Sequence, residues 1–198
     1  MGTKALRGRE NWQNEGGGKA EIAEKKFFDL LTSHFKGTDY AIRSKPREFK
    51  NIYNSVELDP KVLEKIYNPD ETWLHGIVPD YAIDNKRTKK TLYVEVKRQD
   101  GWVEGKPRNA GRGNAHERSC KLFTPGLQRI LREHGHIAED QLPFWVVFQG
   151  DIARDPKRVR EITFWYGEEE DHFFLWHDDS DDKSLILHFE NKLKHLLD

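Results

Sequence analysis

The chain of 198 residues has one cysteine and one methionine, and no apolar run in it is long enough to cross a membrane. The single thiol, Cys120, excludes an intramolecular disulfide and fits a reducing compartment. The first residues lack the apolar core of a secretory signal, so we expect a cytoplasmic protein without a membrane partner. Apolar residues make up only 36% of the chain, but six Trp and eleven Phe supply large side chains for a core.

The chain also lacks appreciable net charge, with a formal value of −1 at pH 7, but its charges are segregated. Between Lys86 and Arg132 there are thirteen Lys and Arg residues and four Asp and Glu residues. Between Glu161 and Asp182 there are nine Asp and Glu residues and no Lys or Arg. A basic middle of this kind favours binding to the phosphates of a nucleic acid. The alternative, that both segments are ordinary solvated charged surface, stays open.

Helical and extended patterns alternate along the chain, which predicts an α/β fold: a single domain with a central mixed β-sheet flanked by helices. Helices are predicted at 20–35, 60–67, 116–134 (interrupted at Thr124-Pro125), 155–162 and 185–197. Strands are predicted at 40–43, 73–83, 91–97, 143–151, 162–166 and 173–176. The apolar run PFWVVFQGD at 143–151 is typical of a buried central strand. Residues 1–18 are polar and glycine-rich, so we expect a mobile N-terminal arm ahead of a domain at 19–198.

Two carboxylates and a lysine lie where a β-hairpin would bring them together. Asp80 is separated by fourteen residues from the sequence Glu95-Val96-Lys97. Glu95 and Lys97 are two apart, so on a strand their side chains leave the same face. A turn at 85–90 would place Asp80, at the start of the partner strand, beside Glu95. Two carboxylates and an ammonium group in one small volume suit Mg²⁺ and phosphodiester hydrolysis.

This pattern has an ordinary structural explanation as well. A strand with alternating charged residues is often a half-solvated edge, and a Pro-Asp pair often marks a turn. The same short motif also occurs in many unrelated sequences. The motif therefore suggests a nuclease without deciding for one.

A second motif, AGRGNAHERSCK at 110–121, follows the second of these strands. Asn114 can bind an adenine through two hydrogen bonds, and an arginine can do so with a guanine. Gly111 and Gly113 permit a close approach of the backbone to base edges, and Ala115 is small enough to follow. The alternative role for each arginine is a phosphate contact.

The combination of PD-x14-EVK with GNAHER resembles the EcoRI family of type II restriction endonucleases, within the PD-(D/E)xK superfamily. Further similar segments are KRQDGWVEGK at 97–106, LPFWVVF at 142–148 and DPKRVREITFWY at 155–166, so that the resemblance covers essentially the whole chain. It implies a restriction-endonuclease-like domain at 19–198 with a recognition loop at 98–118. It also implies site-specific, Mg²⁺-dependent hydrolysis of double-stranded DNA that leaves 5′-phosphate ends.

The resemblance also implies residue roles. Asp80, Glu95 and Lys97 would be catalytic, and Asp80, Glu95 and the backbone carbonyl of Val96 would bind Mg²⁺. Asn114, Glu117 and Arg118 would read an inner AATT, and Arg112 an outer C·G pair, which gives CAATTG. The DNA-binding residues expected in full are Arg112, Gly113, Asn114, Ala115, His116, Glu117 and Arg118, with the role of His116 open. A palindromic site implies a homodimer, functionally paired with a cognate DNA methyltransferase.

Three alternatives stay open. A nuclease of DNA repair or recombination that reads DNA structure would need the carboxylates and the lysine but not GNAHER. A non-catalytic DNA-binding protein would use the same carboxylates only in ion pairs. A protein-interaction module would account for the acidic segment but not for the glycine-rich loop.

Overall fold

The structure is a computed structural model that describes residues 22–67, 75–100 and 115–198. The predicted arm at 1–18 lies outside the described residues, as does the boundary at residue 19. Among the described helices, none combines the length and the apolar character that a membrane crossing requires.

The fold is built on a five-stranded mixed sheet, as predicted, with the strands in chain order across it. The strands are β1 (Tyr40–Ser44), β2 (Tyr81–Asn85), β3 (Thr91–Arg98), β4 (Phe144–Gln149) and β5 (Phe173–Trp176). The first three strands are antiparallel neighbours, whereas β3, β4 and β5 run parallel. The antiparallel half is the β2–β3 hairpin with β1 added beside β2, so a short connection sets the register of β2 and β3 only.

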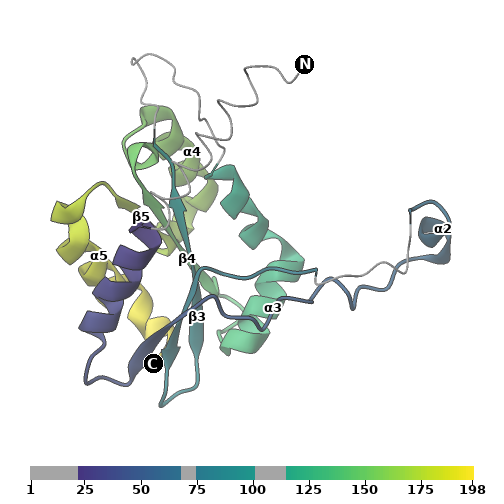
Figure 1. Cartoon of the computed structure of the whole chain (residues 1–198), viewed down its shortest axis with the longest axis horizontal. Helices are drawn as coiled ribbons and strands as arrows, with labels where there is room; N and C mark the ends of the chain where they lie inside the picture. The colour runs from purple at the N-terminus through teal and green to yellow at the C-terminus, as the bar shows by residue number, and fades with distance from the viewer. Residues whose placement is uncertain (1–21, 68–74, 101–114) are drawn as a thin grey trace, which may run out of the picture.

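Helices cover both faces of this sheet (Figure 1). They are α2 (Pro60–Leu63), α3 (Pro125–Gly135), α4 (Pro156–Tyr166) and α5 (Asp182–His188), besides a helix at 22–34. The helix at 22–34 and α5 share one apolar cluster with Trp145 and Val147 of β4. On the opposite face, α3 and α4 share a second cluster with Phe144, Val146 and Phe148. Every residue of β4 is buried, which confirms the predicted central strand.

Short helical turns complete the chain. They are η1 (Glu117–Phe123), η2 (Asp151–Ala153), η3 (Gly167–His172), η4 (Asp179–Asp181), η5 (Phe189–Leu193) and η6 (Lys194–Leu196). The predicted interruption near Thr124-Pro125 is confirmed, because η1 ends at Phe123 and α3 begins at Pro125. The predicted C-terminal helix is present as α5 and its two irregular extensions, η5 and η6.

One predicted strand is wrong. Residues 162–166 do not form a strand but the last turns of α4. The helix begins with Pro156 after Asp155, whose carboxylate accepts bonds from the amides of Lys157 and Arg158 at 2.9 and 3.2 Å. Ile162 and Tyr166 are both buried, and their separation of four residues is helical. The aromatic, β-branched run ITFWY misled a prediction based on local propensity.

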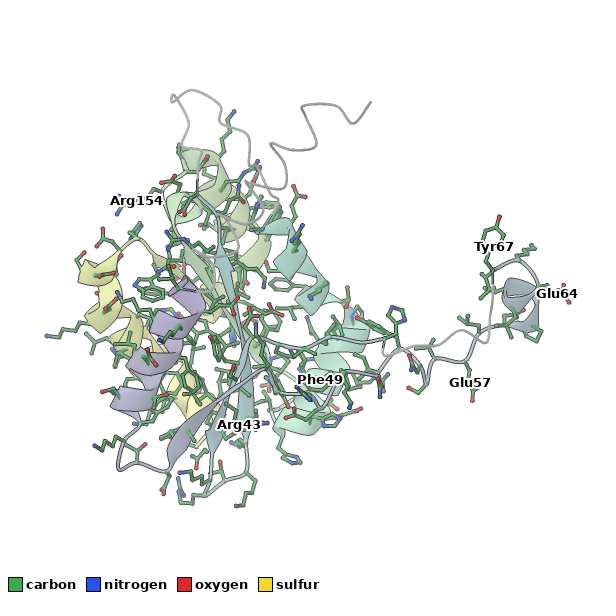
Figure 2. All side chains as sticks on the ribbon, viewed as in Figure 1. Arg43, Phe49, Glu57, Glu64, Tyr67 and Arg154 are labelled. Carbon is green, nitrogen blue, oxygen red and sulfur yellow. The ribbon has the colours of Figure 1, made fainter. Side chains whose placement is uncertain are left out.

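Two other predicted elements are shorter in the structure. The predicted helix at 60–67 is reduced to Pro60–Leu63, in a segment that extends away from the body of the molecule, where Figure 2 labels Glu57, Glu64 and Tyr67. The predicted strand at 73–83 begins only at Tyr81, although Trp73 itself lies outside the described residues. The later start matters for the site, because it leaves Asp80 immediately before the strand.

Candidate active site

Strand register brings Asp80 and Glu95 together. Tyr81 pairs with Val94 across β2 and β3, so the next pair outward in the same register is Asp80 with Glu95. Ser44 pairs with Tyr81 across β1 and β2, so the next pair there is Lys45 with Asp80. Directly opposed residues of antiparallel strands carry their side chains on one face. Lys45, Asp80 and Glu95 therefore lie in one row across three strands.

Both oxygens of the buried Asp80 carboxylate are hydrogen-bonded. Oδ2 accepts from the backbone amide of Val96 at 3.0 Å and lies 3.4 Å from the ammonium group of Lys97. Oδ1 accepts from the ammonium group of Lys45 at 2.8 Å. Lys97 also donates to Oε2 of Glu95, so its ammonium group joins the two carboxylates. The structure thus brings together all three predicted catalytic side chains.

The two carboxylates differ in their electrostatic environment. Burial would raise the pKa of Asp80, but Lys97, Lys45 and the Val96 amide together hold it below its ordinary value. Burial raises the pKa of Glu95 above its ordinary value, and the negative charge of Asp80 adds to that effect against the opposing charge of Lys97. Burial would lower the pKa of Lys97, but both carboxylates hold it raised and the side chain protonated. Asp80 is therefore a stable anion, and Lys97 stays charged. A bound cation would favour the ionised form of Glu95.

Lys45 was not predicted as a site residue. Nothing in the local pattern around it marks a site residue, because its neighbours are Ser44 and Pro46. Only the pairing of β1 with β2 places it beside Asp80. We call Lys45, Asp80, Glu95 and Lys97 together the carboxylate cluster.

The carboxylate cluster fits a small, hard divalent cation. Among the described residues there is no group of three or more Asp, Glu, His or Cys side chains that could hold a metal ion. Mg²⁺ does not need one, because it is commonly bound through one or two carboxylates, with water and substrate phosphate as its other ligands. Asp80 and Glu95 supply those two carboxylates on adjacent strands. The role predicted for the Val96 carbonyl remains a prediction; the amide of the same residue binds Asp80.

The predicted DNA-reading residues fall partly outside the described residues. Arg112, Gly113 and Asn114 lie in the segment 101–114. Glu117 and Arg118 are exposed at the start of η1, and Ala115 is half-buried. Burial raises the pKa of Glu95, and the positive charge of Lys121, also in η1, is among the charges that oppose this effect.

His116 differs from its neighbours because its side chain is fully buried, with 0% exposure. Its ring stacks on Trp165 of α4, with centroids 5.1 Å apart and planes 10° apart. Its Nε2 lies 2.9 Å from Oε2 of Glu161, and Arg158 donates to that same oxygen at 2.7 Å. We call His116, Arg158, Glu161 and Trp165 together the His116 cluster. The His116 cluster therefore attaches the start of η1 to α4.

Gln99 lies just ahead of the segment 101–114. Its backbone amide donates to the carbonyl of Gln149 at 3.1 Å, and its carbonyl accepts from Ile152 at 3.1 Å. Its side-chain oxygen accepts from the amide of Ala115 at 3.3 Å. The residues that precede and follow 101–114 are therefore bonded directly to each other. No motif in the sequence marked Gln99.

The chain is similar to known proteins over its whole length. A family model described as type II restriction enzyme MunI matches residues 1–198. The type II restriction enzyme MunI of a Mycoplasma species is 52% identical over 202 residues, with both chains covered completely. The crystal structure of MunI restriction endonuclease in complex with cognate DNA is similar with a TM-score of 0.80 and 51% identity, covering 95% of this chain and 98% of that one.

Proposed function

Because the chain belongs to the MunI family of type II restriction enzymes, we propose that it hydrolyses double-stranded DNA at the palindrome CAATTG in a Mg²⁺-dependent reaction. The observation that carries the proposal is the contact of the Lys97 ammonium group with both Asp80 and Glu95, which the β2–β3 hairpin brings together. The similarity to a relative whose structure holds cognate DNA supports the substrate class.

Asp80 and Glu95, with the carbonyl of Val96, would hold the metal ion. When bound, Mg²⁺ supplies positive charge beside the scissile phosphate and acidifies water in the site. The raised pKa of Glu95 supports this assignment. Burial disfavours the charged carboxylate, and Lys97 compensates its negative charge only in part. A divalent cation would supply the remaining compensation. The lowered pKa of Asp80 keeps that ligand ionised.

Lys97 would orient the attacking water and stabilise the charge that develops on the phosphate. Its ammonium group lies between both carboxylates, and its raised pKa keeps it charged. A lysine in this state is a better donor to phosphate oxygen than an acceptor of a proton from water. In-line attack by water would leave 5′-phosphate and 3′-hydroxyl ends.

The segment that ends at Arg118 would read the bases. Asn114 suits adenine, and Glu117 and Arg118 would complete reading of the inner AATT. Arg112 would read the outer C·G pair, with Gly113 and Ala115 permitting a close approach. Glu117 and Arg118 are exposed, in accord with contact to DNA, whereas the buried His116 would act from the protein interior.

A palindrome read in this way requires two copies of the chain related by a two-fold axis, each cutting one strand. We therefore propose a homodimer as the active form. A host that carries such an enzyme needs its own CAATTG sites protected, and a cognate DNA methyltransferase would provide that protection.

The test is digestion of a plasmid of known sequence by the purified protein in Mg²⁺, followed by sequencing of the ends. We expect every end to lie within CAATTG and to carry a 5′-phosphate, and a plasmid without that sequence to remain intact. Ends at other sequences, or at branched structures only, would favour the repair nuclease. Specific binding without any product would favour the non-catalytic DNA-binding protein.

The outer base pair is tested separately with Arg112→Ala. If Arg112 reads the C·G pair, its loss relaxes discrimination at that pair by about 1–3 kcal/mol and leaves discrimination within AATT unchanged. Uniform weakening on all sequences, with a reduced dependence on salt, would instead identify Arg112 as a phosphate contact.

A further inference from the structure

Lys45 is bonded to Asp80 through both its backbone and its side chain. Its amide donates to the backbone carbonyl of Asp80 at 2.9 Å. Its ammonium group donates to Oδ1 of the same residue at 2.8 Å. A lysine in an ordinary surface ion pair makes only the second of these contacts. The double contact fixes both the chain and the carboxylate of Asp80.

The backbone of Lys45 has a conformation that lysine rarely adopts. Its φ of 48° lies in the left-handed region, where glycine is the usual residue. Such a conformation persists only when the surroundings enforce it, and it often occurs at functional sites. Since glycine would fit this turn with less strain, a glycine at this position can remove the side chain without disturbing the backbone.

Glu24, in the helix at 22–34, holds the other side of the Lys45 ammonium group. Its Oε2 accepts from Lys45 at 3.0 Å. Its backbone carbonyl accepts from the hydroxyl of Tyr81 at 2.7 Å, which ties this part of the helix to the residue after Asp80. The Lys45 side chain is 49% exposed, so these contacts are not forced by burial.

We propose that Lys45 is a positioning residue for the DNA-cleavage reaction. It holds Oδ1 of Asp80, so that Oδ2 stays turned toward Lys97 and Glu95, where a divalent cation would be shared between the two carboxylates. The inference rests on the proposed function, because it concerns the same site. Residues that orient a metal-binding carboxylate through a hydrogen bond commonly change cation affinity by about 10-fold or more when they are removed.

Lys45→Gly tests the contribution of the Lys45 side chain separately from that of its backbone. Glycine keeps the amide bond to Asp80 and relieves the left-handed strain, but it lacks the ammonium group. We expect thermal stability to be kept or raised, calorimetric Mg²⁺ affinity of the free protein to fall about 10-fold, and the Mg²⁺ concentration for half-maximal cleavage to rise equally. The KM for DNA should not change. Lys45→Arg should restore most of the cation affinity.

Lys89→Gly is the matched control. Among the described residues Lys89 is a second lysine with a left-handed φ, at 65°, and it lies exposed in the turn between β2 and β3. Its replacement relieves the same kind of strain at the opposite end of β2 from Asp80. We expect it to change thermal stability without changing Mg²⁺ affinity or the Mg²⁺ requirement of cleavage.

The alternatives give other results. Unchanged Mg²⁺ affinity in Lys45→Gly would reduce the contact to a surface ion pair, and tighter Mg²⁺ binding would make Lys45 a competitor of the cation. A raised KM for DNA with unchanged Mg²⁺ affinity would make it a phosphate contact. Each of these overturns the proposal. Because calorimetry needs no DNA, the wild-type protein could fail to cut CAATTG and the role of Lys45 would still be decided.

Discussion

The carboxylate cluster and the His116 cluster both pair acidic and basic side chains, but different parts of the fold build them. Lys45, Asp80 and Glu95 lie in one row because three neighbouring strands share a register. His116 meets Glu161, 45 positions later in the sequence, only because η1 packs against α4. The first cluster is set by backbone pairing and the second by side-chain packing.

This difference predicts a division of labour. Substitution of a side chain in the carboxylate cluster leaves the strands paired. It should therefore change the rate of DNA cleavage and not the position of the residues that recognise DNA. Substitution in the His116 cluster removes contacts that hold Ala115 to Arg118 in place, so it should change recognition and not the chemistry. Variants in the two clusters should therefore differ in which property they lose.

Lys97→Met should have the largest effect on rate. It removes the ammonium group that joins Asp80 to Glu95 and leaves those carboxylates with less compensation. We expect single-turnover cleavage in Mg²⁺ to fall by ~10²–10³-fold or more, as for the loss of a donor that stabilises charge in the transition state. Specific DNA binding, measured in Ca²⁺, should persist. Asp80→Ala and Glu95→Ala should also abolish most cleavage, because the groups act together.

Lys86→Met is the control for this change. Lys86 is exposed in the turn of the same hairpin, so the variant makes the same charge change away from the carboxylates. It should cleave at nearly the wild-type rate. If Lys97→Met also cleaved at that rate, the catalytic role of Lys97 would be wrong, and with it the contrast between the clusters.

His116→Ala should have an intermediate effect, and on a different property. It removes the stacking on Trp165 and the bond to Glu161, while the Arg158–Glu161 pair remains. We expect a loss of about 2 kcal/mol in unfolding free energy and a specific affinity for CAATTG lowered by roughly 10-fold. The single-turnover rate at saturating DNA should change little.

Competition binding with CAATTG and scrambled duplexes measures this effect, and His116→Phe is the matched variant because it keeps an aromatic ring on Trp165. It should recover part of the discrimination. The division between the clusters would fail if His116→Ala slowed cleavage at saturating DNA as strongly as Lys97→Met does.

The same contrast explains which features the sequence allowed us to predict. Asp80, Glu95 and Lys97 were predictable because one hairpin connects them, and a turn at 85–90 with period-two alternation fixes their relation. Lys45 was not, because its place depends on the pairing of β1, which follows from no local pattern. Trp165 was not either, since the strand predicted at 162–166 would have given it a different periodicity from α4. Glu161 lies in the predicted helix, but its contact with His116 depends on packing between distant segments.

Buried histidines give the smallest predicted effect, seen in the pH dependence of stability. Burial lowers the pKa of His116, helped by the charge of Arg158, and burial lowers the pKa of His172 and His188 as well. The unfolded chain, with histidine near pKa 6.5, then binds more protons than the native state below neutral pH. The stability that these groups contribute is therefore present above about pH 6.5 and is lost as the pH falls.

The carboxylate cluster contributes to the pH dependence of stability with the opposite sign at Glu95, and in a lower pH range at Asp80. The raised pKa of Glu95 favours the native state as the pH falls, and the lowered pKa of Asp80 matters only below about pH 4. His116→Phe isolates one histidine from these opposing contributions. Urea unfolding at pH 7.5 and 5.5 should show a smaller acid-induced loss in this variant than in the wild type, by at most about 1.4 kcal/mol per pH unit. An equal loss would mean that His116 does not titrate in this range, and that its cluster acts through packing and hydrogen bonding alone.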